Sequence, residues 1–565
     1  MYSFPGGYET ERTLYADLAG IRLGPVDSKD RVQRESRSPD AGRHDGTTSQ
    51  RPVSRVAGSS SATFSVKASS TQAGSRRSGG AASVAGGGAV TGGAVTGGIR
   101  TQEREKKVRR RKPKRRTELG LLVLVALIIA GLYTILELDT RSRPPAHLGV
   151  FIGALLGVAF VAHMINRFLA PDASAAFLPL AALGNGLGGV MILRIDPAEA
   201  KLQAVWTGVS LILYGLTLLV VRRSRDLDRY RYILLLAAIG LILAPLVPGL
   251  GVDIYGERLF VHAGPIEGQP IELAKILLAI FFASYFSEKQ EMLRIPTRRF
   301  GNRLVVDPAP LGPIVAAAAL SLLVLVAERN VGFGILLFAF FVAIFWVATG
   351  QYRWIVFGTA LFAAGLEVGI RLLPQVQERI TAWIHPFSHA QTSGYQIVQG
   401  LYSLGTGGIA GTGLGLGQPR FVPFASTDMI FSIIGEELGL LGAATVVFLF
   451  LLFLGTGLRA AQQARSDFSK LLATGLVVIL SMQAFFIMGG ITRLFPFTGL
   501  ALPFIAYGGS SLVGNYVLIA ILVRISDEGN RPSRIAEAQA RALPLSDGAA
   551  DPGYEINLPS WSTPG

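Results

Sequence analysis

The chain has 565 residues, of which 50% are hydrophobic and only 16% charged; it has no cysteine, and its formal net charge is +15. A mean hydropathy of +0.43 is too high for an ordinary soluble protein. The lack of cysteine excludes a disulfide scaffold and any cysteine-ligated metal site. Ten Lys or Arg residues fall within 104–116, directly before an apolar segment, so this basic block indicates a membrane surface rather than nucleic acid.

Both ends of the chain have the composition of disordered tails. Residues 1–117 are rich in Ser, Gly, Thr and Arg, and they hold too little apolar surface to offset the entropy of ordering. No apolar stretch typical of a signal peptide opens this tail. Residues 527–565 are also polar and contain several prolines. We therefore predict cytoplasmic tails at 1–117 and 527–565 around a membrane domain at 118–526.

Between the tails lie twelve apolar segments of about 18–25 residues, the length that crosses a hydrocarbon core. These segments are 118–138, 148–169, 174–193, 202–221, 231–249, 269–287, 311–327, 331–349, 352–372, 429–455, 469–490 and 502–524. The pattern predicts an all-α, polytopic membrane protein with about twelve transmembrane helices.

The loops between these segments orient the protein. The loops 222–231, 288–309 and 459–470 are rich in Lys and Arg, and they fall on the same side as the basic block. Since cytoplasmic loops carry the excess of basic residues, both termini are predicted to be cytoplasmic and the long loop 373–428 to lie outside. Twelve spans are also typical of a transporter, but the two halves show no convincing internal repeat.

Ionisable residues inside predicted spans are costly and mark candidate sites. Glu272 and Lys275 are three residues apart in the span 269–287, so they lie on one face of a helix. Two interpretations stay open. The pair neutralises itself while tying helices together, or it borders a polar cavity near the outer leaflet in which Lys275 holds a phosphate.

Asp428 closes the external loop and precedes the span 429–455. It follows Ser426 and Thr427, and all three are good helix caps, where a carboxylate also suits the helix dipole. The alternative is a catalytic carboxylate at the outer mouth of the bundle. Seven of the residues 405–417 are glycine, which predicts either a flexible linker or a backbone that lies close to a ligand. No strand precedes this run, so it is not a nucleotide-binding loop.

The segment 493–511 holds Pro496, Gly499, Pro503 and the pair Gly508–Gly509. These residues are expected to break the start of the last span. Broken helices at membrane depth are tolerated where they line a cavity within the protein.

Four sequence runs, taken together and in this order, resemble the SEDS (shape, elongation, division and sporulation) family, which includes RodA and FtsW. The runs are Gln-Pro-Ile-Glu-Leu-Ala-Lys at 269–275, Thr-Asp-Met-Ile-Phe at 427–431 after the glycine-rich loop, Ile-Gly-Glu-Glu-Leu-Gly at 434–439, and Leu-Pro-Phe-Ile-Ala-Tyr-Gly-Gly-Ser-Ser at 502–511. The resemblance covers residues 230–526 approximately. Within the family, the chain is most similar to RodA-type members from actinobacteria. It implies a core of ten spans, so two N-terminal helices are additional.

The resemblance implies a peptidoglycan glycosyltransferase of the bacterial cytoplasmic membrane. Members polymerise lipid II, an undecaprenyl-diphosphate-linked disaccharide peptide, at the outer face during cell elongation or division. They commonly work with a class B penicillin-binding protein. Membrane lipids are expected partners and nucleic acid is not.

By position, Asp428 matches the essential aspartate of the family, and Glu272 and Lys275 match its cavity pair. We expect Asp428 to act as general base on the acceptor hydroxyl, and Lys275 to stabilise the departing diphosphate. A Mg²⁺ or Mn²⁺ ion on Asp428 is the alternative, and no organic cofactor is expected. Further substrate contacts are predicted at Gln269, Gln396, Gln399, Ser510 and Ser511.

Several residues depart from the family pattern, among them Leu259-Phe260 in place of a usual stretch with Arg or Trp. Ile271 stands where Ser is usual, Asn330 where Asp is common, and Phe424 where Glu often precedes the catalytic aspartate. Two other functions therefore stay open at this point: a flippase for the lipid-linked precursor, and a scaffold of the cell-wall machinery without catalytic activity.

Overall fold

A computed structural model describes residues 115–141, 148–254, 257–263, 266–294, 298–300, 303–305 and 330–531. Nearly all of the two predicted tails and the whole predicted span 311–327 lie outside these residues.

The described part of the chain is built mainly from helices that follow the predicted spans. In chain order they are α3 (Arg115–Arg141), α4 (Leu148–Leu169), α5 (Phe177–Ile195), α6 (Pro197–Val220), α7 (Asp226–Arg229), α8 (Arg231–Leu243), α9 (Ile271–Arg294), α11 (Val331–Thr349), α12 (Arg353–Leu372), α13 (Pro374–Ile384), α14 (Tyr395–Gly407), α15 (Ile430–Gln463), α16 (Asp467–Ile491) and α17 (Gly509–Asn530).

Nine of the described helices are long and apolar enough to cross a membrane, namely α3, α4, α5, α6, α11, α12, α15, α16 and α17. Two predicted spans have a different form. The span 231–249 is a shorter apolar helix, α8, followed by the 3₁₀ turn Ala244–Leu246. The span 269–287 is α9, which includes the charged residues Glu272, Lys275 and Glu288. The described residues thus form a multi-pass bundle, although they do not establish the number twelve.

The last helix begins later than its apolar sequence suggests. The predicted span starts at residue 502, but α17 starts at Gly509 because the preceding residues form turns. Proline and paired glycines in this segment oppose a helix, as the sequence predicts. α17 also runs on to Asn530, beyond the predicted boundary at 526.

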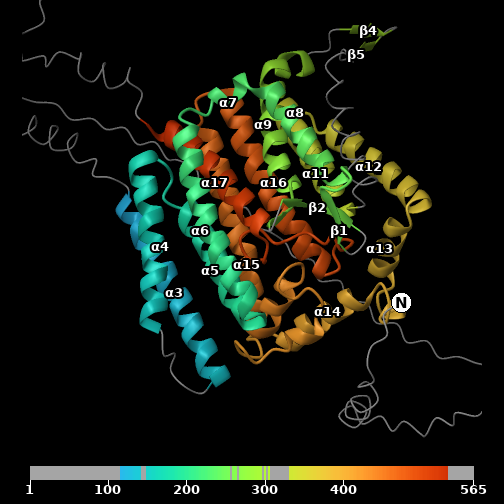
Figure 1. Cartoon of the computed structure of the whole chain (residues 1–565). Helices are drawn as coiled ribbons and strands as arrows, with labels where there is room; N and C mark the ends of the chain where they lie inside the picture. Colours follow the sequence, from blue (N-terminus) through green and yellow to red (C-terminus); the bar gives the residue numbers. More distant parts are fainter. Residues whose placement is uncertain are drawn as a thin grey trace, which may run out of the picture. The chain divides into compact units, whose positions relative to one another are not determined.

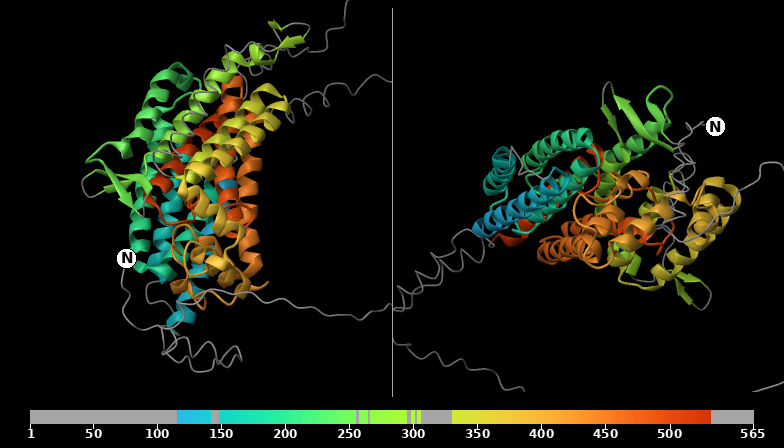
Figure 2. Two further views of the ribbon diagram at one scale, coloured as in Figure 1. Left: turned by 90° about the vertical axis from the view of Figure 1, so that its right-hand side faces the viewer. Right: turned by 90° about the horizontal axis from the view of Figure 1, so that it is seen from below.

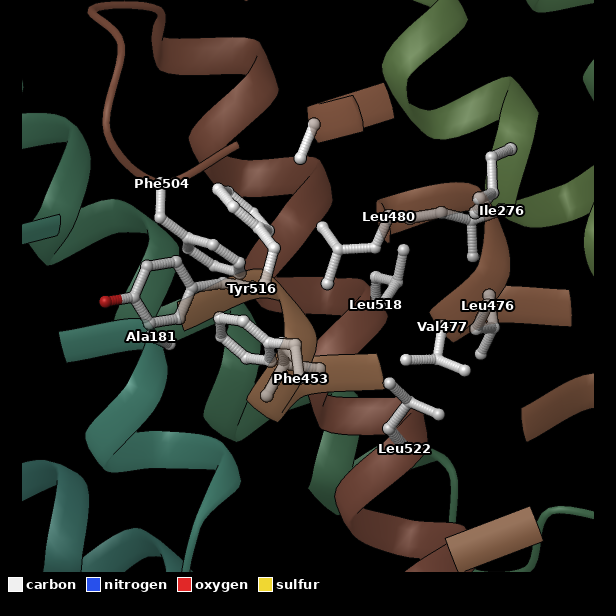
Figure 3. Close-up of a cluster of buried hydrophobic side chains, with 14 of the residues drawn as sticks. Ala181, Ile276, Phe453, Leu476, Val477, Leu480, Phe504, Tyr516, Leu518 and Leu522 are labelled. Atoms are coloured by element: carbon white, nitrogen blue, oxygen red, sulfur yellow. The ribbon is translucent and has the colours of Figure 1, made fainter. Parts of the chain in front are cut away.

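The core of the bundle lies around α15, α16 and α17. α17 packs against α6 and α15, and α16 packs against α9, α11 and α15. Figure 3 shows Phe453, Phe504, Tyr516 and Leu518 gathered in this region, and the rings of Phe453 and Phe504 stack with their centroids 5.4 Å apart. Burying these aromatic side chains against each other is a large packing contribution.

Two small sheets occupy connections that the sequence does not mark as strands. β1 (Gly251–Ile254), β2 (Glu257–Ala263) and β3 (Ile266–Gly268) form an antiparallel sheet in that order, with Val261 opposite both Gly251 and Gly268. β4 (Arg298–Phe300) and β5 (Arg303–Val305) form an antiparallel hairpin. The first sheet precedes α9 and is visible beside the helices in Figure 2.

The two ends of the bundle differ. α13 and α14 lie at one end, and α7 and the β4–β5 hairpin lie at the other (Figure 1). We call the first the α14 end and the second the α7 end. The predicted external loop 373–428 forms the α14 end, whereas the basic loop 222–231 and the described hairpin of the loop 288–309 belong to the α7 end.

The two N-terminal helices that the sequence predicts to be additional are α3 and α4, which lie at one edge beside α5 and α6 (Figure 1). A buried polar cluster joins them to the rest. Glu118 of α3 accepts hydrogen bonds from Arg115 and from Asn166 of α4 (3.2 Å), and it contacts His163 Nδ1 at 3.0 Å. Tyr214 of α6 donates to Asn166 Oδ1 at 2.5 Å. Since buried polar groups need such partners, this cluster fixes the position of the helix pair.

Candidate active site

Asp428 lies in a turn at the α14 end, two residues before α15. The capping position of that helix is Met429, so Asp428 does not hold the N-cap position considered from the sequence. Asp428 is half-buried. Its Oδ2 lies 3.7 Å from the point that a Cβ on Gly499 would occupy, and Arg379 Nη1 lies 3.6 Å from the same point. The carboxylate and the guanidinium therefore converge on the turn at Gly499, whose φ of +64° suits only glycine well.

Arg379 is not among the site residues predicted from the sequence. It lies on α13, an 11-residue helix that opens with a proline in its first turn, where proline is well tolerated. Arg379 Nη1 donates to the carbonyl oxygens of Phe497 (3.2 Å) and Thr498 (2.9 Å). The sequence pattern that could have pointed to Arg379 is an arginine four residues before a tryptophan in an amphipathic stretch. Arg379 and Trp383 therefore share one helix face.

A second set of hydrogen bonds fastens α13 to the same segment. Trp383 Nε1 donates to the carbonyl oxygen of Arg493 at 3.0 Å, and Arg493 Nε donates to the carbonyl oxygen of Trp383 at 3.2 Å. Arg493 has a φ of +62°, an uncommon conformation for a residue with a side chain. The helix that carries Arg379 is thus fixed to this segment at Arg379 and again one turn later, at Trp383.

The backbone around Asp428 is held in an unusual conformation. Phe424 and Phe504 have φ values of +55° and +66°. The amide of Met429 donates to the Phe424 carbonyl at 3.0 Å, and the amide of Tyr507 donates to the Ser426 carbonyl at 2.8 Å. Strained backbone of this kind clusters at functional sites. Phe424, a departure from the family pattern, thus begins the turn that carries Asp428.

Asn330, another departure, has a clear structural role. It is the N-cap of α11, and its Oδ1 accepts a hydrogen bond from the Phe333 amide at 2.7 Å. Asn and Asp are equally good at this position, so the exchange keeps the cap. A Cβ on Gly332 would collide with the carbonyl oxygen of Thr498, which shows that the start of α11 lies directly against the Thr498–Gly499 turn.

The glycine-rich loop wraps around α15. Glu436 accepts hydrogen bonds from Ser403 Oγ (2.8 Å) and the Gln418 amide (3.0 Å), and Glu437 accepts one from the Gly415 amide (2.8 Å). A Cβ on Gly411, whose φ is +88°, would collide with the Glu437 carbonyl oxygen. The glycines therefore allow a close backbone approach to α15.

Glu272 and Lys275 form a fully buried pair, 1% and 0% exposed. Lys275 Nζ donates to Glu272 Oε2 at 2.5 Å and to Gln483 Oε1 of α16 at 2.6 Å. Gln483 Nε2 in turn donates to the Ala501 carbonyl at 3.0 Å. The pair therefore ties α9 to α16 and to the segment before α17. This geometry matches the first interpretation from the sequence, in which the pair joins helices.

The other predicted substrate contacts are spread over three elements. Ser510 and Ser511 lie in the first turn of α17, and Ser511 Oγ accepts a hydrogen bond from Asn515 Nδ2 at 3.2 Å. Gln269 is half-buried just before α9. Gln396 and Gln399 lie on α14, which packs against α15. Within the described part of the chain, Gln396 Nε2 is buried and has no hydrogen-bond partner.

In the part of the chain that the structure describes, the residues near Asp428 do not form a complete metal site by themselves. Among the residues that the structure describes, no group of three or more His, Asp or Glu side chains could hold a metal ion. Because Mg²⁺ and Mn²⁺ prefer six oxygen ligands, a divalent ion on Asp428 would have to take further ligands from substrate phosphates and water.

An apolar cavity of about 490 Å³ opens beside Arg379. Its walls come from α11, α12, α13 and α16 and from the segment 495–498. Arg379 and Thr498 are among the few polar residues that line it. Thr498 is 3% exposed, and its Oγ1 has no hydrogen-bond partner among the described residues. The site thus combines a carboxylate, a guanidinium and an adjacent apolar space.

Comparisons with known proteins agree with this architecture. The family model of FtsW, RodA and SpoVE, described as "Cell cycle protein", matches residues 195–531. "Peptidoglycan glycosyltransferase RodA" of Mycobacterium tuberculosis (strain ATCC 25618 / H37Rv) is 38% identical over 428 residues, which are 74% of this chain and 91% of that protein. "Stage V sporulation protein E" of Bacillus subtilis (strain 168) is 32% identical over 288 residues, 51% of this chain and 76% of that protein.

Among solved structures, one chain of a peptidoglycan synthase complex is similar, with a TM-score of 0.52 and 25% sequence identity. The similarity covers 63% of this chain and 97% of that chain. The family match and the fold agree with the resemblance seen in the four sequence runs. This chain is therefore a multi-pass membrane protein of the FtsW/RodA/SpoVE family of cell cycle proteins.

Proposed function

We propose that this protein is a peptidoglycan glycosyltransferase that polymerises lipid II at the outer face of the bacterial cytoplasmic membrane. The observation that carries the proposal is the convergence of Asp428 and Arg379 on Gly499, next to an apolar cavity. Lipid II has a sugar, a diphosphate and a polyprenyl tail. A carboxylate, a cation and an apolar space at one end of a membrane bundle suit these three parts.

The reaction joins a sugar hydroxyl to an anomeric carbon. The 4-hydroxyl of the acceptor attacks the anomeric carbon of the other sugar, and the bond from that carbon to the lipid diphosphate breaks. Asp428, as an ionised carboxylate, takes the proton of the attacking hydroxyl. The lipid diphosphate leaves with the electron pair, and a fixed cation stabilises its developing charge.

We assign the cation role to Arg379 rather than to Lys275. The Arg379 guanidinium lies near Asp428, with its Nη1 held by two backbone carbonyls. A planar guanidinium also matches phosphate oxygens in a bidentate manner. In contrast, the Lys275 amino group is fully buried against Glu272 and Gln483. We infer that Lys275 positions α9. If the protein uses a divalent cation, Asp428 would help to hold it, and the ion would supply further positive charge to the departing diphosphate.

The distribution of basic loops supports an outward-facing site. The Arg-rich loop 222–231 lies at the α7 end, opposite to the end that carries Asp428 and α14. The positive-inside rule then places the α7 end and both termini in the cytoplasm. Asp428 lies at the end of the bundle, whereas transporter sites usually lie near the bilayer midplane, which favours the polymerase over a flippase.

A class B penicillin-binding protein is the proposed partner. The similar solved chain comes from a complex described as coordinating polymerization and crosslinking. Glycan strands from this protein would be the substrate of such a partner. The "RodA" name of the mycobacterial relative favours a role in elongation and cell shape.

The assay that tests the function uses the purified chain and lipid II in detergent micelles, with and without the penicillin-binding protein. Micelles have no second leaflet, so a flippase activity cannot contribute to the product. We expect glycan polymer, and we expect Arg379→Ala to lower its rate by about 10²–10³-fold, the usual loss for one charge-stabilising group. Arg371→Ala, at an exposed α12 arginine paired with Glu367, is the matched control.

Absence of polymer under both conditions would contradict the proposed function. Polymer from Arg379→Ala at the wild-type rate would contradict only the role of Arg379.

A further inference from the structure

A second cavity, of about 460 Å³, lies between the additional helices and the rest of the bundle. Its walls come from α3, α4, α5 and α6, and Tyr516 of α17 closes it. The family model begins at residue 195, so α3 and α4 lie in a part of the chain that the model does not match. The cavity is as large as a typical small-molecule site.

The walls of this cavity are of two kinds. On the α3 and α4 side they are apolar and include Ile129, Phe151 and Leu155. On the α6 side they include Gln203 and Thr207. This division indicates a ligand with a hydrocarbon part and a polar part.

Gln203 gives the strongest sign of a missing ligand. It is 2% exposed and lines the cavity, yet neither Oε1 nor Nε2 has a hydrogen-bond partner in the described part of the chain. A buried carboxamide without partners is unfavourable. Its polar neighbours on the cavity wall bond to each other instead, since Asn185 Nδ2 donates to Thr207 Oγ1 at 3.0 Å. A ligand with both a hydrogen-bond acceptor and a hydrogen-bond donor would therefore satisfy the Gln203 carboxamide.

A charged group lies at the mouth of the same cavity. Lys201 lines it, is exposed, and precedes Gln203 by two residues in the first turns of α6. This part of α6 is at the α14 end, because Arg194, just before α6, donates to the carbonyl oxygen of Gly417 in the glycine-rich loop at 3.0 Å. A phosphate at Lys201 would thus sit at the membrane surface, and a chain below it would extend along α3 and α4.

We infer that this cavity binds one anionic glycerophospholipid from the leaflet at the α14 end. Lys201 binds the phosphate, Gln203 bonds to an ester carbonyl and a headgroup hydroxyl, and an acyl chain fills the apolar part. A polyprenyl phosphate offers no ester or hydroxyl at the depth of Gln203. A partner's transmembrane helix is about 10 Å wide, which is too wide for a cavity of this volume.

The cavity is connected to the candidate active site through α5. A Cβ on Gly188 would collide with the Ile505 carbonyl oxygen, and a Cβ on Gly184 would lie 3.2 Å from Phe504 Cβ. α5 therefore packs directly on the segment whose Tyr507 amide holds the Asp428 turn. A lipid on the opposite side of α5 supports this packing, so its binding is expected to stabilise the site as well.

The test uses a variant that fills the cavity. Gly189 lines the cavity, and an added Cβ would meet nothing within 4 Å, so the leucine side chain of Gly189→Leu is expected to extend into the cavity and fill part of it. Gly153→Leu is the matched control, because Gly153 is also a helical glycine with open space around it but does not line the cavity. The full-length chain, purified and delipidated in detergent, is titrated with phosphatidylglycerol, phosphatidylcholine or undecaprenyl phosphate.

We expect phosphatidylglycerol to raise the melting temperature of the wild type and of Gly153→Leu, but not of Gly189→Leu. Gln203→Leu should weaken phosphatidylglycerol binding about fivefold or more, as expected for a lost buried hydrogen bond. Lys201→Gln should remove the preference for phosphatidylglycerol over phosphatidylcholine.

Equal responses of Gly189→Leu and wild type would overturn the proposal. A response to undecaprenyl phosphate alone would overturn the assignment to a glycerophospholipid. Loss of partner binding by Gly189→Leu, without any lipid effect, would indicate a protein ligand instead.

Discussion

Asp428→Ala is expected to lower the rate of glycan polymerisation by about 10²–10⁴-fold, the usual contribution of a positioned general base. Membrane insertion and folding should stay intact. The turn that carries Asp428 is held by backbone hydrogen bonds from Met429 to Phe424 and from Tyr507 to Ser426, and the substitution keeps these bonds. The measurement is the initial rate of polymer formation by purified protein, together with its melting temperature.

A surface carboxylate provides the control for this substitution. Asp467 lies in the first turn of α16 and is 68% exposed, with Lys470 as its partner at 3.2 Å. Asp467→Ala should polymerise at nearly the wild-type rate. If Asp428→Ala retained its rate, the base would have to be another group. If its melting temperature fell sharply, Asp428 would be mainly a structural residue of the α15 turn.

Lys275→Ala is expected to remove both folding stability and activity. The substitution leaves the Glu272 carboxylate buried without its cation, and breaking a buried pair in this way costs about 3–5 kcal/mol. The substitution also removes the hydrogen bond from Lys275 Nζ to Gln483 Oε1, which is 2.6 Å long. We expect a lower melting temperature and little folded protein, measured in detergent extracts. Lys470→Ala, at a half-exposed surface pair, should have little effect.

A double variant separates the positioning role of Lys275 from substrate binding. Glu272→Gln with Lys275→Met removes both charges at similar volume, a change that buried ion pairs often tolerate. We expect the double variant to fold and to regain most of the polymerisation rate. A well-folded double variant without activity would contradict this expectation. That result would instead support the prediction from the sequence that Lys275 binds the diphosphate.

The bundle itself could be predicted because membrane spans depend on local composition. Segments such as 174–193 and 469–490 are long and apolar, and a helix is the structure that satisfies their backbone in lipid. The strands β1 to β5 could not be predicted, since they are short and lie in connections without a clear alternation of apolar and polar residues. α8 is shorter than predicted because Pro245 and Pro248 end its helical run.

The candidate site could be predicted only in part. Asp428 stands out in the sequence because a recognisable run surrounds it. Arg379 does not, because its relation to Asp428 depends on Gly499, and the three residues are far apart in the chain. Gln483 is equally hidden, since it belongs to the Lys275 pair only once α9 and α16 pack together. The contact of the glycine-rich loop with Glu436 and Glu437 likewise depends on tertiary packing, so the local sequence does not reveal it.

We propose that the end of the bundle with Asp428 polymerises lipid II from the leaflet it faces. The most direct test uses proteoliposomes with lipid II in one leaflet only. Because the chain has no cysteine, an impermeant thiol label on Gln391→Cys, an exposed position before α14, reports the orientation of each preparation. We predict polymer only when lipid II and residue 391 are on the same side. Polymer only from the opposite leaflet, or transfer of lipid II across the bilayer without polymer, would contradict the account.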